Sequence, residues 1–100
     1  MKYGIADKLM QNIIQIFSKH IEIEKVIIFG SRAKGTYKNG SDIDLAIIGD
    51  INIQNLNLIS IELDNLESPY IFDLCNYNKI NNLDLKEHID RVGKEIYKSN

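Results

Sequence analysis

Two aspartates stand in an apolar stretch of the sequence, where ionised carboxylates are costly. Asp42 and Asp44 flank Ile43, and apolar residues 45–48 follow directly. Side chains alternate between the faces of a strand, so both carboxylates would point to one face and Ile43 to the other. Like charges this close repel each other, and burial adds the cost of desolvation. A bound cation would offset both costs, and oxygen ligands suit hard ions such as Mg²⁺.

A glycine and a serine precede this acid pair by ten residues. Gly30 and Ser31 follow the apolar run 26–29, which predicts a strand. Glycine lets the backbone come close to a bound anion, and residues 31–34 are expected to form a short helical turn with free N–H groups at its start. Metal-binding acids beside such a turn favour chemistry on a nucleoside triphosphate.

This pattern resembles the Gly-Ser-x10-Asp-x-Asp signature of the DNA polymerase beta-like nucleotidyltransferase superfamily, and the chain resembles its minimal members over roughly residues 20–98. The resemblance implies that Asp42 and Asp44 are catalytic carboxylates that hold two Mg²⁺ ions, with Mn²⁺ as an alternative. It also implies that Gly30 and Ser31 bind the β- and γ-phosphates of the nucleotide. Arg32 would assist in nucleotide binding, although its place at the start of a helix equally suits a salt bridge.

A third carboxylate, Asp73, lies between Phe72 and Leu74 in a strand expected over residues 70–75. An acid near a strand end can simply reach solvent. The resemblance instead assigns Asp73 as the third catalytic carboxylate, a metal ligand and the acceptor of a proton. Three other acids are expected on the solvated side of a helix: Glu62, Asp64 and Glu67.

The elements that must position these residues follow from apolar periodicity and turn residues. Helices are predicted over 5–20, 53–66 and 85–98, and strands over 25–29, 42–48 and 70–75. Asn52 is expected to cap the second helix, and Asp84 with Glu87 to form a capping box for the last. Asn39-Gly40 is a turn signal that would make the first two strands neighbours. The order predicts an α/β (α+β) sandwich with a small mixed or mostly antiparallel sheet, and the resemblance implies the nucleotidyltransferase fold.

Length and composition restrict the class of protein. The 100 residues predict a single domain, 1–100, with 44% hydrophobic and 26% charged residues. A net charge of −2 gives no basic footprint, so nucleic acid is not expected as a partner. No apolar run is long enough for a membrane helix, and the N-terminus lacks an apolar signal region. The single Cys75 cannot form an internal disulfide, and a cytoplasmic location is expected. Cys75 is expected to pack as a small apolar side chain, and His20 and His88 to lie on the surface.

The acceptor of the nucleotide has no evident binding module in so short a chain. By resemblance, many minimal nucleotidyltransferases are paired with a small all-helical protein, and in toxin–antitoxin pairs the transferase adds AMP from ATP to a tyrosine of a HEPN ribonuclease toxin. Two alternatives remain open. The chain could be a non-catalytic binding module that neutralises a helical partner, or the catalytic half of an antibiotic-type nucleotidyltransferase.

Overall fold

The computed structural model describes all 100 residues and contains four α-helices, four strands and one short 3-10 turn. In chain order they are α1 (Asp7–Ser18), β1 (Ile23–Phe29), α2 (Gly30–Lys34), β2 (Ile43–Gly49), α3 (Ile53–Asp64), β3 (Phe72–Asn76), η1 (Tyr77–Lys79), α4 (Leu83–Val92) and β4 (Lys94–Lys98). Up to residue 76 the predicted elements are confirmed, with ends that differ by at most two residues. None of the helices has both the length and the apolar composition needed to cross a bilayer.

The four strands form one mixed sheet in the order β3-β2-β1-β4. β1 pairs antiparallel with β2 and with β4, whereas β2 and β3 run parallel. The predicted contact between the first two strands is therefore confirmed. Parallel neighbours need a long crossover connection, and α3 supplies it between β2 and β3.

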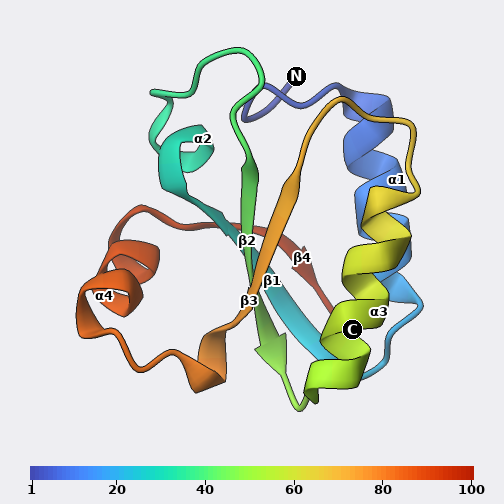
Figure 1. The fold of residues 1–100 in the computed structure, drawn as a ribbon, viewed down its shortest axis with the longest axis vertical. Helices are drawn as coiled ribbons and strands as arrows, with labels where there is room; N and C mark the ends of the chain where they lie inside the picture. Colours follow the sequence, from blue (N-terminus) through green and yellow to red (C-terminus); the bar gives the residue numbers. More distant parts are fainter.

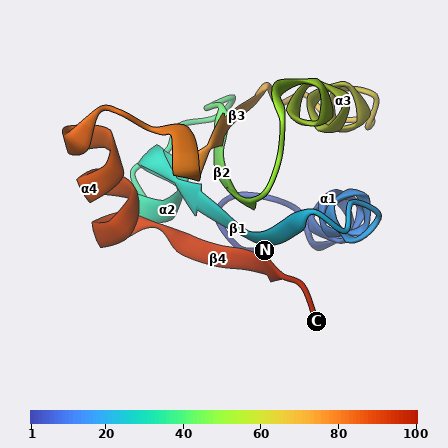
Figure 2. The ribbon, with the colours of Figure 1, turned by 90° about the horizontal axis from the view of Figure 1, so that it is seen from below.

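Helices cover both faces of this sheet. α1 and α3 lie side by side on one face, and α2 and α4 lie on the other (Figure 1). Figure 2, turned by 90°, shows the same arrangement with the strands between the two pairs of helices. The predicted α/β sandwich is confirmed, and the two faces have different roles.

The hydrophobic core lies between the sheet and the α1/α3 pair. On β2, Ile43, Leu45 and Ile47 are fully buried and point to this face, as strand alternation requires. From the helices, Phe17 of α1 and Ile59 of α3 belong to the same cluster. One face of β2 is therefore committed to this core, and the other carries Asp44 followed by Ala46 and Ile48.

The chain after residue 92 corrects the sequence prediction. A helix was expected to continue to residue 98, but α4 ends at Val92 and residues 94–98 form β4. Gly93 leaves the helix in an extended conformation, with φ −63° and ψ 148°. A Cβ at Gly93 would come within 3.0 Å of the Ile89 carbonyl oxygen and of the Ile27 side chain, so a larger residue here would require the neighbouring atoms to shift. β4 then completes the free edge of β1.

The start of α4 also differs from the prediction. Its N-cap is Asn82, whose Oδ1 accepts a hydrogen bond from the Leu85 backbone N–H at 3.1 Å. Asp84 lies inside the first turn, so the expected capping box with Glu87 is wrong. The prediction for α3 is confirmed, because Asn52 Oδ1 accepts a hydrogen bond from the Asn55 N–H at 2.8 Å.

His20 is not a surface residue as expected. Its side chain is 12% exposed, and its Nε2 lies 2.6 Å from Glu62 Oε1. Nδ1 of the same ring lies 3.4 Å from Glu22. His20 therefore joins the end of α1 to α3. Glu62 lies on the helix where it was predicted, but it contacts His20 and does not face only solvent.

Candidate active site

The three aspartates meet on the sheet face opposite the hydrophobic core. Asp44 lies on β2, and its partner in the parallel register with β3 is Asp73. Asp42 comes one residue before β2 and shares the face of Asp44, because the two are separated by one buried isoleucine. Asp44 is half-buried, whereas Asp42 and Asp73 are exposed. The structure thus gathers two acids from one strand segment and a third from its neighbour.

A tight turn at the end of β1 lies against this acid group. Phe29, the last residue of β1, pairs with Asp44, so the next residue, Gly30, faces the Asp44 carboxylate. Gly30 has φ 72°, a left-handed conformation that glycine adopts readily. A Cβ built on Gly30 would come within 3.0 Å of Asp44 Oδ2. The turn and the carboxylate therefore occupy neighbouring space that leaves no room for a side chain.

Charge repulsion is visible at Asp44. Partial burial raises the pKa of Asp44 above its usual value, and the charges of Asp73 and Asp42 raise it further. His88 and Arg32 act in the opposite direction. None of the three aspartates takes part in a side-chain hydrogen bond or a salt bridge within the chain. Their negative charge is available to an external cation.

The donors suit a magnesium ion that arrives with a nucleotide. No group of three or more His, Cys, Asp or Glu side chains is gathered closely enough to hold a metal by itself. Mg²⁺, however, is usually bound by only one or two carboxylates, with waters and substrate phosphates as its other ligands. Asp42 and Asp44 provide oxygen donors of this kind, and the two-ion site stays a prediction.

His88 belongs to this site, contrary to the expectation that it lies on the surface. Its Nε2 accepts a hydrogen bond from the Gly30 backbone N–H at 3.2 Å. Its ring meets Phe29 edge-on, with centroids 6.1 Å apart. The signal was present in the sequence: His88 falls on the apolar stripe of α4, three residues after Leu85 and four before Val92. A histidine on the inner stripe of a helix needs a polar partner, and here that partner is the turn.

Arg32 does not make the salt bridge that was one of its expected roles. The residue is 2% exposed, and its guanidinium donates to the backbone carbonyls of Ser41 and Tyr3. The nucleotide-binding role predicted for Arg32 stays a prediction, as do the roles of Gly30 and Ser31.

Cys75 behaves as expected of a packed thiol. Burial raises its pKa to about 11, and the neighbouring charges of Asp73 and Asp44 add to the rise. At neutral pH the thiol is therefore protonated, which excludes it as a ready nucleophile.

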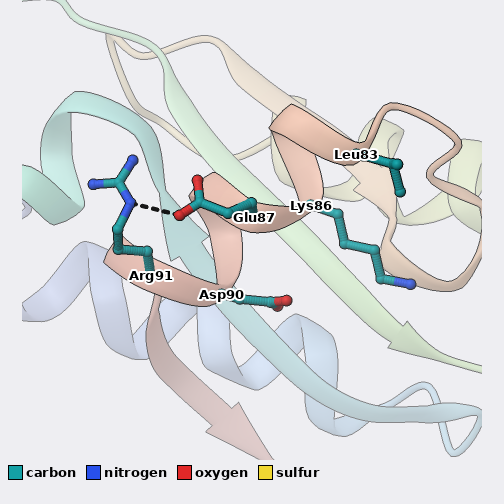
Figure 3. A pocket seen from close by; sticks show the side chains of 5 residues that line it. All are labelled: Leu83, Lys86, Glu87, Asp90 and Arg91. Carbon is teal, nitrogen blue, oxygen red and sulfur yellow. Dashed lines mark hydrogen bonds and ion pairs between the residues drawn. The ribbon is translucent and has the colours of Figure 1, made fainter.

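The largest hollow on the surface, about 490 Å³, lies away from the aspartates. Figure 3 shows that its walls are side chains of α4 alone, with an ion pair between Glu87 and Arg91 at 2.9 Å. No aspartate of the acid group and no residue of the turn lines it. We assign the candidate active site to the three aspartates and not to this hollow, because the size of a hollow does not by itself supply reactive groups.

Comparison with known proteins agrees with this geometry. The family model described as polymerase beta, nucleotidyltransferase matches residues 11–100. A protein of Methanocaldococcus jannaschii, provisionally named a protein adenylyltransferase, is 38% identical over 53 residues, which are 53% of this chain and 38% of that protein. The chain thus spans well under half the length of this relative.

Solved structures share the fold. A chain in the crystal structure of a toxin–antitoxin with AMP-PNP is 22% identical, with a TM-score of 0.72 over 91% of this chain and 74% of that one. A chain in the structure of the tri-AMPylated Shewanella oneidensis HEPN toxin in complex with an MNT antitoxin is 18% identical, with a TM-score of 0.66 over 92% and 71%. Because the family match covers both strands of the motif, the turn and all three aspartates, the chain belongs to the polymerase beta nucleotidyltransferase family.

Proposed function

We propose that the chain transfers AMP from ATP to a hydroxyl of a protein partner, most simply a tyrosine of a HEPN-type toxin, and thereby acts as its antitoxin. The observation that carries the proposal is the register of β2 and β3, which sets Asp73 beside Asp44 and next to the Gly30 turn. The relatives named for protein adenylylation, AMP-PNP and an AMPylated HEPN toxin support the choice of nucleotide and acceptor.

Each group of the chain has a defined task in this reaction. Asp42 and Asp44 would hold Mg²⁺, which when bound neutralises phosphate charge and favours the leaving pyrophosphate. Backbone N–H groups after Gly30 would hold the β- and γ-phosphates. Asp73, exposed on the neighbouring strand, would take the proton of the acceptor hydroxyl. The hydroxyl oxygen then bonds to the α-phosphorus, the bond from that phosphorus to the bridging oxygen breaks, and pyrophosphate leaves.

Most of the catalysis would come from position and charge. The backbones of Asp44 and Asp73 are fixed by two hydrogen-bonded strands, and Asp42 lies next to the start of one of them, so little reorganisation of the backbone is needed when the substrates bind. α2 and α4 stand on this face of the sheet (Figure 2), and the acceptor hydroxyl would be presented from outside the chain. A second protein surface is the simplest source of that hydroxyl.

The proposal is tested by expressing the chain with the small helical protein encoded beside it. Mass spectrometry of the partner should show added AMP with the wild-type chain and none with Asp42→Asn/Asp44→Asn. The matched control is Asp50→Asn/Asp64→Asn, which removes the same two charges from exposed positions away from the site. Binding of the partner should survive in both variants.

Three other outcomes would change the conclusion. An unmodified partner that is still neutralised by the wild-type chain would favour the binding module. Label from ATP on a small molecule would favour the antibiotic-type transferase. Equal thermal midpoints with and without Mg²⁺ and nucleotide, for wild type and the double variant alike, would contradict the metal site, because a ligand that binds the folded state must stabilise it.

A further inference from the structure

Arg32 is the only charged side chain that the fold buries, and it has no carboxylate partner. Its Nε and Nη2 donate to the Ser41 carbonyl oxygen at 3.1 and 2.7 Å, and its Nη1 donates to the Tyr3 carbonyl oxygen at 2.9 Å. The guanidinium also lies over two rings, 4.5 Å from the centroid of Tyr70 and 5.2 Å from that of Tyr37. Backbone oxygens and ring faces thus compensate the buried charge.

Two of these partners lie just before the aspartates of the active site in the sequence. Ser41 directly precedes Asp42, and the two bonds from one planar guanidinium fix the direction of its carbonyl. Tyr70 lies three residues before Asp73, on the approach to β3. Arg32 itself follows the Gly30-Ser31 turn by one residue. One side chain therefore connects the turn to the segment that leads into each of the two acid-bearing strands.

The turn at Gly4, near the N-terminus, packs against Arg32 and the two tyrosine rings. The Tyr70 hydroxyl donates to the Gly4 carbonyl oxygen at 3.4 Å. Gly4 has φ 71°, and a Cβ there would come within 3.0 Å of the Tyr37 ring and of Arg32 Nη1. Arg32 is held tightly enough that reaching a triphosphate would require it to give up three hydrogen bonds.

We propose that Arg32 is a positioning residue, which sets Asp42 and Asp73 relative to the Gly30-Ser31 turn and does not bind the triphosphate. The positioning of Asp42 and Asp73 by Arg32 does not depend on the chain having any enzymatic activity. Its kinetic consequence rests on the proposed nucleotidyl transfer.

Arg32→Lys tests the positioning itself, because lysine keeps the charge but loses the planar fork and the stacking. In ¹H–¹⁵N spectra of the full chain, the amide signals of Asp42 and Asp73 should shift. The control, Arg91→Lys, changes an exposed arginine of α4 and should leave both signals in place. Shifts confined to α2 in Arg32→Lys would overturn the proposal, whether or not the wild type transfers AMP.

Kinetics then separate positioning from direct binding. A displacement of the carboxylates by about 1 Å should lower kcat for AMP transfer on the order of a hundredfold. KM for ATP at saturating Mg²⁺ should stay within about threefold, and the Mg²⁺ concentration for half-maximal rate should rise. A tenfold or larger rise in KM with kcat retained would instead mean that Arg32 contacts the phosphates, and would overturn the proposal. A wild-type chain that transfers nothing, together with shifted Asp42 and Asp73 signals, would refute the proposed function and leave the positioning role standing.

A second variant serves if Arg32→Lys does not fold. Tyr70→Leu leaves Arg32 in place but removes one ring face and the bond to Gly4. The Asp73 amide signal should shift and kcat should fall while KM for ATP is kept. An unshifted Asp73 signal in a folded Tyr70→Leu protein would count against the connection to β3.

Discussion

Gly30→Ala is the sharpest test of how the turn and the acid group are built together. The alanine would have to adopt φ near 72° and its Cβ would overlap Asp44 Oδ2. A left-handed conformation costs a residue with a Cβ about 1–2 kcal/mol. A carboxylate pushed off its preferred rotamer adds about 0.5–1.5 kcal/mol. Together these predict a loss of about 1.5–3.5 kcal/mol in the free energy of unfolding, which in a domain of this size lowers Tm by roughly 6–28 °C.

Gly35→Ala is the matched control. Gly35 has φ 83°, but a Cβ there would meet no atom within 4 Å. This variant should therefore lose only the backbone contribution of about 1–2 kcal/mol. The difference in Tm between the two variants measures the displacement of Asp44. AMP transfer, assayed below both midpoints, should fall on the order of a hundredfold in Gly30→Ala and remain close to wild type in Gly35→Ala.

A double variant isolates the overlap. In an Asp44→Ala background the obstructing oxygen is gone, so the difference in stability between Gly30→Ala and Gly35→Ala should disappear. Equal losses of Tm for the two glycine variants in the wild-type background, with transfer retained by Gly30→Ala, would refute the close approach of turn and carboxylate.

Three further predictions follow from particular side chains. Burial and neighbouring acids raise the pKa of Asp44, so the fold loses stability as pH rises from the unfolded pKa of about 3.9 to the higher folded pKa, and the loss is complete above it. Asp44→Asn should therefore raise Tm in metal-free buffer at neutral pH and leave it unchanged near pH 3, where Asp44 is protonated in both states. Cys75, with its pKa raised to about 11, should react slowly with iodoacetamide at neutral pH and faster as the pH approaches that value, as followed by mass spectrometry. Asn82→Ala should cost about 1 kcal/mol in denaturant unfolding and Asp84→Ala clearly less, and a larger effect at Asp84 would restore the rejected capping box.

The sequence was most informative where the chemistry is local. Asp42, Asp44 and Gly30 lie within fifteen residues of one another, and strand alternation is enough to put the two carboxylates on one face. Asp73 was harder, because its place beside Asp44 depends on a parallel register set by the crossover through α3. The strand that carries Asp73 was predicted correctly, but its place beside the acid pair came from resemblance and not from periodicity.

Failures occurred where distant residues decide the outcome. Helical spacing continues through Leu85, Ile89, Val92 and Ile96, yet residues 94–98 pair with the open edge of β1 and form a strand. Gly93 was the available warning, since glycine weakens a helix interior by about 1 kcal/mol. The surface position expected for His88 and the salt bridge considered for Arg32 were wrong for the same reason: their partners are a backbone N–H 58 residues away and carbonyls on other segments. Helical spacing placed His88 on the inner stripe of α4, but spacing does not say which distant group a side chain will meet.

The hydrogen bond from Gly30 to His88 makes an imidazole and a phosphate competitors for one donor. The Gly30 N–H already has an acceptor at 3.2 Å before any nucleotide arrives. A triphosphate must therefore either displace the ring or be held by the N–H groups that follow, beginning with Ser31. In the first case binding would push α4 away from the turn, and in the second α4 would remain in place as a rigid wall. The Gly30 N–H has an acceptor in both cases, whereas His88 Nε2 loses its donor only in the first, so the ¹⁵N chemical shift of His88 Nε2 distinguishes the two.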